Sequence, residues 1–599
     1  MQAIPVTASE SSTGSETIAD LLPLAGQKHA TATAIRHKLE GEWRDVTFGE
    51  VAEIVSEIGR GLIDLGIESG DRVCILCTTR PEWTYADFAI ASAGAVVVPI
   101  YPTNSPEECE WVAGNSEARV VIAEDASQVA KILEVRERLP NLETIVVIDP
   151  SGDLGDATSL DEVRERGRGR EASELEDRTA AVGPDDPFTF IYTSGTTGPP
   201  KGCVLTHANY RDVTDMLESL DAVERDEVIY LFLPLAHAFA LLIQLVSFDV
   251  GGMLVYFGGD PKQIVPELQE VKPTYVPSVP RIFEKIFTLA SAAVKEQLGE
   301  EGFRQAVALG VGVRDMKVRG EPVPPELEEK FDQFDDTVGK NVRSVFGGRV
   351  RQAVSGAAPI APEILEFFYA CGVPVLEGYG MTETSTVATY STLQAHRFGT
   401  VGRAIPGCEI KTADDGEVLI KGPNVFQGYY KDAEKSFGTI EDGWLRTGDL
   451  GTLDDGYLTI TGRKKDIIIT AGGKNITPAL IENDVKRSRW ISQAVMHGDR
   501  RPFPVMLITL DEEEIVPWAK EKGLPEDVTS LAGHEQVHEL VQGVLDEVNS
   551  RYAQVEQVKK FAILDHDLSQ ETGELTPTLK VKRNVVYEKY AELFDSLYR

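Results

Sequence analysis

The chain has 599 residues, of which 59 are Lys or Arg and 96 are Asp or Glu, and its formal net charge is −37. This balance argues against nucleic acid as a main partner, because phosphate binding needs a basic surface, and against simple electrostatic docking to anionic lipid. Hydrophobic residues make up 42%, which argues against disorder and, at this length, predicts roughly two to four domains.

Residues 1–30 are rich in Ser, Thr and Glu, and we expect them to form a loose lead-in. The first basic residue is Lys28 and no apolar segment precedes it, so the pattern of a secretory signal is missing. The six cysteines are sparse and scattered, which favours a reducing compartment. Cys74 and Cys77 form a CxxC pair in a predicted strand, where residues three apart face opposite sides, so we interpret them as buried structural thiols. A cytoplasmic protein is expected, with peripheral membrane contact left open.

From about residue 48 onward, amphipathic helical patterns alternate with short apolar runs that read as buried strands. Helices are predicted at 51–65 and 85–93, and strands at 72–78, 95–101 and 118–123. This alternation is typical of an α/β fold with a parallel sheet.

Two charged segments interrupt this pattern. Residues 151–185 are poor in apolar side chains and are predicted to form a solvated excursion. Residues 293–345 are also highly charged and are predicted to form helices or loops on the surface.

The uncharged run at 231–248 is long enough to raise the question of a membrane span. Pro234, His237 and Gln244 interrupt it, and no basic cluster flanks it. A buried core segment is therefore the preferred interpretation.

The sequence pattern changes after Thr470. A glycine-rich break at 471–475 is followed by the start of a helix and then by further strands. We place a domain boundary just before this break, which gives predicted domains at 1–464 and 465–599.

The most informative stretch is a predicted strand at 188–192 that runs into a loop rich in glycine and hydroxyl groups. Glycines let the backbone fold tightly, so that hydroxyls and backbone N–H groups can surround phosphate oxygens, while a lysine adds positive charge. A Walker A loop is excluded, because the lysine is followed by Gly202 and not by Ser or Thr. The predicted phosphate-binding residues are Thr193, Ser194, Gly195, Thr196, Thr197, Gly198 and Lys201.

The string YTSGTTGPPKG in this loop closely resembles the phosphate loop of the adenylate-forming superfamily, which includes acyl-CoA synthetases, luciferases and peptide-synthetase adenylation domains. Five further segments resemble that family's motifs in the right order, so the resemblance runs from about residue 45 to the end. These segments are 355–359, 377–383, 444–449, 461–466 and 577–583. The resemblance implies a large multi-sheet α/β amino-terminal domain and a small, mobile α+β carboxy-terminal domain.

The resemblance also implies ATP and Mg²⁺ as cofactors, and coenzyme A as co-substrate. Glu383 is the candidate carboxylate ligand of Mg²⁺ with Thr193 close to the same ion, and Thr382 is expected to hydrogen-bond the α-phosphate. Tyr379, between two glycines, is expected to lie flat on adenine, and Asp449 to accept both ribose hydroxyls. The other implied nucleotide- or acceptor-binding residues are Gly356, Ala357, Glu377, Gly378, Gly380, Arg463, Lys465, Gly472 and Gly473.

The carboxy-terminal motif contains two lysines, and only one can be the family's catalytic lysine. The spacing to Arg583 favours Lys580 over Lys582, although Leu579 stands where the family commonly has glycine before the lysine. The resemblance implies that Lys580 neutralises charge during adenylation and is then turned away by a swing of the small domain about its hinge.

Several features resemble long-chain acyl-CoA synthetases in particular: the charged insertion at 293–345 and the segments at 346–359, 498–502 and 576–583. His237 stands where the family places an aromatic residue or His beside the acyl pocket. The implied activity is ATP-dependent conversion of a long-chain fatty acid to acyl-CoA through an acyl-adenylate. A fatty acyl-AMP ligase that serves a carrier protein and a non-catalytic lipid- or nucleotide-binding relative remain the alternatives.

Residues 534–538 match the HExxH pattern of zinc proteases. The sequence offers no persuasive third ligand downstream, so an acidic amphipathic helix is the preferred interpretation.

Overall fold

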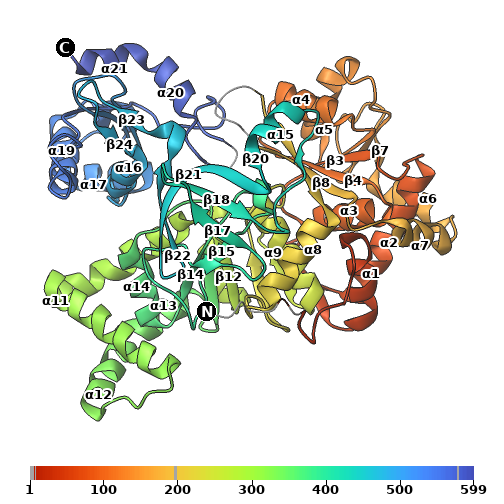
Figure 1. Ribbon diagram of the computed structural model, residues 1–599, viewed down its shortest axis with the longest axis horizontal. Helices are drawn as coiled ribbons and strands as arrows, with labels where there is room; N and C mark the ends of the chain where they lie inside the picture. The colour runs from red at the N-terminus through yellow and green to blue at the C-terminus, as the bar shows by residue number, and fades with distance from the viewer. Residues whose placement is uncertain (1–5, 7, 194–198, 577–578) are drawn as a thin grey trace.

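The computed structural model describes residues 6, 8–193, 199–576 and 579–599. This part of the chain forms two large sheets with helices between and around them, and a smaller group of strands and helices at the carboxy-terminal end (Figure 1). One hydrophobic cluster contains residues from both large sheets, so the two sheets share a core. The predicted α/β class is confirmed.

The first sheet has eight strands, and its central strands are parallel. β3 (Arg72–Leu76) lies between β4 (Val96–Ile100) and β5 (Val120–Ala123), and the Val- and Ile-rich sequences of these strands suit burial on both faces. β8 (Pro187–Thr193) pairs parallel with β4, and β9 (Lys201–Thr206) folds back antiparallel on β8. The phosphate loop therefore starts at the carboxyl edge of parallel strands, where α/β proteins commonly bind ligands.

The second sheet has 14 strands. β12 (Tyr275–Ser278), β13 (Gln352–Ser355) and β14 (Val375–Tyr379) are parallel neighbours. Beyond β14 the pairing becomes antiparallel and leads to the ladder of β21 (Trp444–Asp454) with β22 (Tyr457–Arg463). This order brings four of the predicted motifs into one sheet, on two pairs of neighbouring strands, β13 with β14 and β21 with β22.

The uncharged run at 231–248 is a buried core segment, as predicted. It includes most of α9 (Ala238–Val250), in which 12 of 13 residues are buried. Gln244 is satisfied inside this core, because its amide donates to Asp87 at 2.8 Å and accepts from Thr84 at 2.6 Å. None of the described helices combines the length and apolar character that a membrane span needs.

Most residues of the segment 151–185 are exposed, as predicted, but the segment is not a loose excursion from the fold. It contains α6 (Leu160–Arg168), which packs tightly along α2 (Phe48–Asp64). Glycines make the approach possible: a Cβ at Gly167 would lie 1.8 Å from the Glu57 carbonyl oxygen, and one at Gly61 would lie 2.1 Å from that of Val163. This backbone-to-backbone contact cannot be predicted from the hydrophobicity of the segment.

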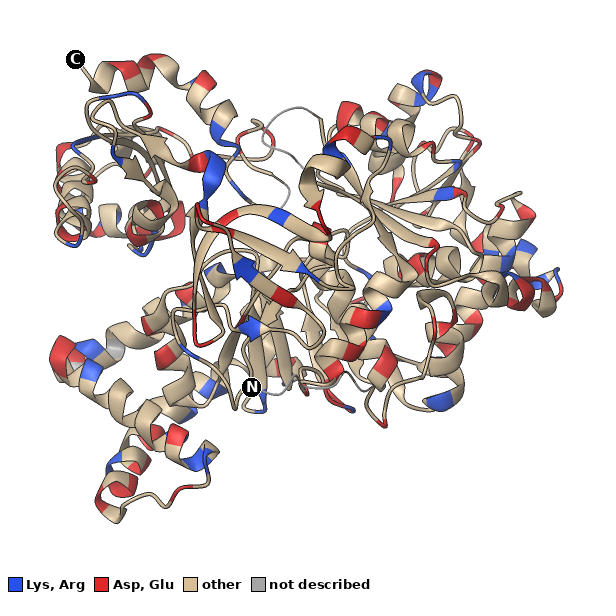
Figure 2. Ribbon diagram, in the orientation of Figure 1, with Lys and Arg blue, Asp and Glu red and all other residues tan. Residues whose placement is uncertain are grey.

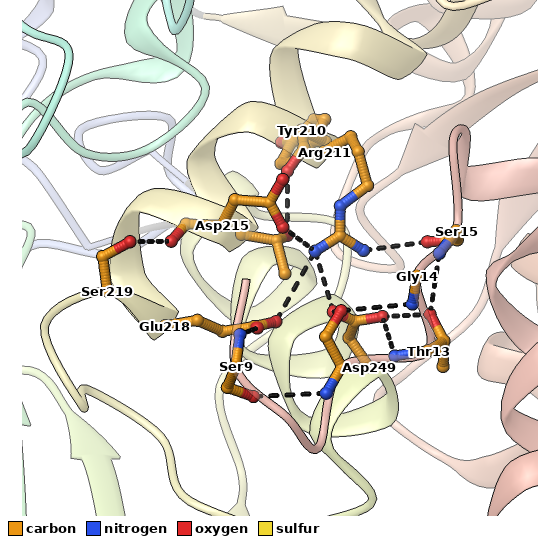
Figure 3. Close-up of polar contacts among 12 residues, drawn as sticks. Ser9, Thr13, Gly14, Ser15, Tyr210, Arg211, Asp215, Glu218, Ser219 and Asp249 are labelled. Atoms are coloured by element: carbon orange, nitrogen blue, oxygen red, sulfur yellow. Dashed lines mark hydrogen bonds and ion pairs between the residues drawn. The ribbon is translucent and has the colours of Figure 1, made fainter. Parts of the chain in front are cut away.

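The lead-in is also more ordered than predicted. α1 (Ile18–Lys28) has a capping box formed by Thr17 and Asp20. The segment before it binds to a buried ion-pair network on α8 (His207–Glu218) and α9, centred on Arg211 (Figure 3). The hydrogen bonds of that segment run from Ser9 N–H to Glu218, from Ser12 Oγ and Thr13 N–H to Asp249, and from Arg211 to Ser15 Oγ.

The charged segment 293–345 forms helices on the surface, as predicted. It covers most of α11 (Pro280–Val318), together with α12 (Pro325–Phe334) and α13 (Lys340–Val345). Figure 2 shows acidic and basic residues along α11 and α12, where these helices project from the body of the molecule. Apolar side chains such as Phe303 and Phe334 anchor them to a second hydrophobic cluster.

Residues from Ile468 onward have hydrophobic clusters of their own. A three-stranded sheet of β25 (Ile491–His497), β26 (Val505–Leu510) and β27 (Lys560–Ile563) contains both antiparallel and parallel pairs. α16 (Pro478–Lys486) and α19 (Glu535–Asn549) contribute buried residues to the same core. The mixed pairing agrees with the expected α+β character of this end.

Candidate active site

Asp449, Arg463 and Tyr379 form one polar cluster. Asp449 and Arg463 are register partners in the β21–β22 ladder, and Arg463 Nε donates to Asp449 Oδ1 at 2.9 Å. The Tyr379 hydroxyl, at the end of β14, donates to Asp449 Oδ2 at 2.8 Å. Burial, and then the Asp449 charge, raise the pKa of Tyr379 well above its ordinary value. A carboxylate held in this way is a strong acceptor for a pair of neighbouring hydroxyls.

The residues around Tyr379 have distinct packing roles. A Cβ at Gly380 would lie 2.2 Å from the Thr386 carbonyl oxygen, whereas one at Gly378 would make only an ordinary contact at 3.4 Å. Glycine is thus required at 380 by the chain itself. Glu377 is buried in β14, and burial raises its pKa to about 8.

The loop at 356–359 follows β13, the strand that pairs with β14. A Cβ at Gly356 would be 3.4 Å from the ring of Phe239, in the first turn of α9. Ala357 is exposed and has a φ of 69°. The loop therefore meets the beginning of the helix that His237 caps.

Glu383 lies in the short turn η4 (Thr382–Thr384), which follows β14 of one large sheet and contacts β9 of the other. Its side chain is 7% exposed and accepts a hydrogen bond from the Tyr429 hydroxyl at 2.7 Å. Among the described residues, no Lys or Arg forms an ion pair with it. A buried carboxylate with a single hydroxyl partner suits a hard divalent cation such as Mg²⁺.

The described ends of the phosphate loop flank this carboxylate. Thr193 and Lys201 pair across the β8–β9 ladder, and β9 contacts η4. Lys201 Nζ lies 5.1 Å from the ring centre of Tyr429. The predicted loop residues between them lie outside the described residues; these are Ser194, Gly195, Thr196, Thr197 and Gly198.

Lys580 reaches this cluster from the carboxy-terminal part of the chain. Desolvation, and then the positive charge of Arg463, lower the pKa of Lys580, while Asp449 and Glu383 act in the opposite direction. The backbone N–H of Lys580 donates to Thr576 Oγ1 at 3.0 Å, which supports the loop that presents it. One ammonium thus lies within electrostatic range of both predicted site carboxylates.

Leu579 explains why glycine suits the position before this lysine. Its φ is 58°, in the left-handed region that glycine adopts without strain. The turn geometry is therefore kept although the residue differs from the commoner one.

His237 also lies near Lys580. It caps α9 with its Nδ1, which accepts from Phe239 N–H at 3.2 Å. Burial, and then the charge of Lys580, lower its pKa to about 4, so the imidazole is neutral at pH 7. Lys582 points elsewhere, with its Nζ 3.8 Å from Glu108 on α4 (Pro106–Ser116).

Two predicted elements lie apart from this cluster or at its edge. Desolvation, and then Arg463, lower the pKa of Lys465, in η5 (Lys464–Asp466), so it lies at the edge of the site. Gly472 and Gly473 lie in an exposed turn between β23 (Ile468–Ile469) and β24 (Asn475–Ile476). A Cβ at Gly472 would meet only Thr470 within 4 Å, and one at Gly473 would meet nothing.

Sequence reasoning missed Tyr429 and Lys435. Tyr429 is held by β19 (Gly428–Tyr429), which pairs with β9, and no local pattern indicates that its hydroxyl meets Glu383. The only local signal is the string Gly-Tyr-Tyr at 428–430, which is followed by the mostly charged segment 431–435 and indicates a turn between them.

Neither of the other candidate metal groups is supported. His534 caps α19, with its Nδ1 accepting from Gln536 N–H at 3.3 Å. Within the described ranges, the HExxH histidines belong to no group of metal-binding side chains. The carboxylates of Asp215, Glu218 and Asp249 do cluster, but Arg211 bonds two of them at 2.6 and 2.8 Å and occupies the position of a cation.

Solved structures with a similar fold are adenylate-forming enzymes. The adenylation domain of a carboxylate reductase from Mycobacterium chelonae has a TM-score of 0.76 at 20% identity, covering 98% of this chain and 92% of that one. A fatty acyl CoA synthetase of Mycobacterium tuberculosis has a TM-score of 0.62 at 22% identity, covering 96% and 99%. These likenesses establish the fold.

Sequence relatives give a closer match. Long-chain-fatty-acid–CoA ligase FadD15 of Mycobacterium tuberculosis is 40% identical over 565 residues, which are 94% of this chain and 93% of that protein. Long-chain-fatty-acid–CoA ligase ACSBG2 of Gallus gallus is 33% identical, over 98% of this chain and 82% of its own. Residues 24–430 match the AMP-binding enzyme family and residues 465–599 match the AMP-binding enzyme C-terminal domain. The chain belongs to the family of AMP-binding enzymes.

Proposed function

We propose that this protein is an ATP-dependent ligase that joins a long-chain fatty acid to coenzyme A and releases AMP and pyrophosphate. The observation that carries the proposal is the convergence of Lys580 with Asp449 and Glu383, which lie more than a hundred residues away in the chain. Relatives named long-chain-fatty-acid–CoA ligases support the substrate class. We place the enzyme in the cytoplasm, with transient membrane contact to collect its substrate.

In the first half-reaction a carboxylate oxygen of the fatty acid attacks the α-phosphorus of ATP. The bond from that phosphorus to the bridging oxygen breaks, and pyrophosphate takes the electron pair. Lys580 neutralises charge between carboxylate and α-phosphate, and Thr382 donates to an α-phosphate oxygen. Asp449 and Arg463 hold the ribose. Mg²⁺, held by Glu383 and Thr193, would neutralise the triphosphate.

In the second half-reaction the thiolate of coenzyme A attacks the acyl carbonyl, and the bond from that carbon to the AMP oxygen breaks. We propose that residues 465–599 turn as a domain relative to residues 1–464. Lys580 then leaves the site and the turn at Gly472 and Gly473 borders the pantetheine path. Domain closure of this kind builds two sites from one set of elements.

The rival activity is acyl transfer to a carrier protein by a fatty acyl-AMP ligase. In that group an insertion in the small domain is thought to block the domain movement. Here η5 runs directly into the β23–β24 hairpin, which favours the coenzyme A enzyme. The intact Glu383, Asp449 and Lys580 argue against a non-catalytic relative.

The proposed substrate class predicts a rise of kcat/KM with chain length. Each buried CH₂ contributes ~0.8 kcal/mol, so each added methylene should raise kcat/KM about fourfold until the acyl site is filled. The measurement is thioester formation, read by mass, for saturated acids of graded length with ATP and coenzyme A. A flat profile, or a maximum at acetate or butyrate, would contradict a long-chain site.

The proposed role of the glycine turn predicts a selective loss in Gly472→Leu. Gly472 is the better test position because the φ of Gly473 is 78°, where a side chain would strain the backbone. The added Cβ would make only an ordinary contact with Thr470 at 3.9 Å in this conformation, so fatty-acid-dependent ATP–pyrophosphate exchange should be unchanged. Thioester formation from acyl-adenylate should fall at least about tenfold through crowding of the pantetheine path. Equal rates of thioester formation in variant and parent would remove the turn from that path.

A further inference from the structure

The short helix α15 (Ala433–Thr439) follows the strand that pairs with β9, and it presents a lysine that the mechanism above does not use. α15 follows β19, the strand that carries Tyr429 and pairs with β9, and β9 begins at Lys201. Lys435 is exposed on this helix, and its backbone N–H is capped by Asp432 Oδ1 at 3.1 Å. Among the described residues, its ammonium forms no ion pair that would tie it to α15.

The side chains of Lys435 and Lys201 lie close together at the start of β9. Burial, and then the neighbouring Lys435, lower the pKa of Lys201 to about 8. Lys201 Nζ also lies 5.1 Å from the ring centre of Tyr429, whose hydroxyl donates to Glu383. Two ammonium groups thus lie next to each other, close to Glu383, the candidate metal ligand.

Neither lysine has an ion-pair partner within the part of the chain that the structure describes. The contrast with Lys431, one turn away, is informative, because its Nζ lies 3.0 Å from Glu117 and donates to the Asn115 carbonyl at 3.0 Å. In a chain with a net charge of −37, carboxylates are abundant, yet the nearby Asp432 and Glu383 act on Lys201 without forming an ion pair among the described residues. Two adjacent cations repel each other, and a polyanion between them would convert that repulsion into two charge-assisted contacts.

We propose that Lys435 is a second triphosphate-binding lysine, which together with Lys201 holds the β- and γ-phosphates of ATP and the pyrophosphate product. The inference rests on the adenylation proposed above, and adds a binding residue from outside the predicted motifs. AMP and acyl-adenylate keep only the α-phosphate, which the mechanism proposed above places beside Thr382 and Lys580. Lys435 should therefore discriminate between nucleotides with and without the terminal phosphates.

The test compares Lys435→Ala with the parent protein in three measurements. The KM for ATP and the inhibition constant of pyrophosphate in adenylation should each rise about tenfold or more, since a hydrogen bond to a charged group is lost. Thioester formation from supplied acyl-adenylate should stay within about twofold, as expected for a half-reaction without terminal phosphates. Lys435→Arg should restore both constants, because the charge and its reach are kept.

Lys431→Ala is the matched control, because it removes a lysine of the same segment whose charge is already paired. It should leave all three measurements unchanged. Unaltered ATP and pyrophosphate constants in Lys435→Ala, with normal exchange in the parent, would overturn this inference alone. A parent protein without fatty-acid-dependent exchange would overturn the proposed function and this inference together. Equal losses in Lys435→Ala for both half-reactions would assign the residue a structural role.

Discussion

Lys580→Ala is expected to lose acyl-adenylate formation while still making thioester from supplied acyl-adenylate. Lys580 comes from the carboxy-terminal loop at 579–582 and lies within electrostatic range of His237, Asp449 and Glu383. Removal of a single group that stabilises transition-state charge costs about 10²–10³ in rate. Fatty-acid-dependent ATP–pyrophosphate exchange measures the first half-reaction, and single-turnover thioester formation measures the second.

Lys582→Ala is the matched control for this prediction. Its ammonium lies 3.8 Å from Glu108 on the surface of α4, so both half-reactions should remain near the parent rates. General destabilisation would lower the two half-reactions together, and the expected pattern is asymmetric. If folded Lys580→Ala loses both half-reactions equally, alternation of the small domain is wrong for this chain.

Glu383→Gln should reduce adenylation by about 10² or more, because it removes the negative charge from the proposed Mg²⁺ ligand and keeps its shape. The Tyr429 hydroxyl can still donate to the amide oxygen of the new side chain, so folding should be little affected. The rate should recover partly as Mg²⁺ is raised. Exchange rates over a range of Mg²⁺ concentrations, with thermal unfolding of each variant, give the measurement.

Glu377→Gln provides the comparison for Glu383→Gln. Burial raises the pKa of Glu377 to about 8, so this carboxyl is mostly neutral at pH 7 and an amide resembles it closely. A small effect at 377 beside a large one at 383 would show that charge, and not amide substitution, is responsible. Near-parental activity of Glu383→Gln at ordinary Mg²⁺ would remove Glu383 from the metal site.

The parts of the site that could be predicted are those whose functional residues lie together in short motifs. The hydroxyl-rich loop after an apolar strand indicated a phosphate site at a strand end, and β8 does end at Thr193 while β9 begins at Lys201. Asp449 and Arg463 were assigned to one ribose from two separate motifs, and they are direct partners in the β21–β22 ladder. In these cases the residue types and their spacing within a short segment are enough to predict the site.

The parts that could not be predicted depend on contacts between distant backbones and side chains. α6 packs on α2 because two glycines remove the Cβ atoms that would collide, and the charged sequence around them looks solvated. The network around Arg211 joins the amino-terminal segment to α8 and α9 over about two hundred residues of sequence. Lys435 is an ordinary surface lysine until the fold places it against Lys201.

The most direct test of the proposed function is a single-turnover experiment with purified full-length protein, hexadecanoic acid, ATP and Mg²⁺, analysed by mass before and after addition of coenzyme A. Before the addition, enzyme-bound hexadecanoyl-adenylate and pyrophosphate should form in equal amounts. After it, the adenylate should disappear as hexadecanoyl-CoA and AMP form in equal amounts. An adenylate that persists in the presence of coenzyme A would contradict the coenzyme A ligase and point to the acyl-AMP ligase, and the absence of any adenylate would contradict adenylation itself.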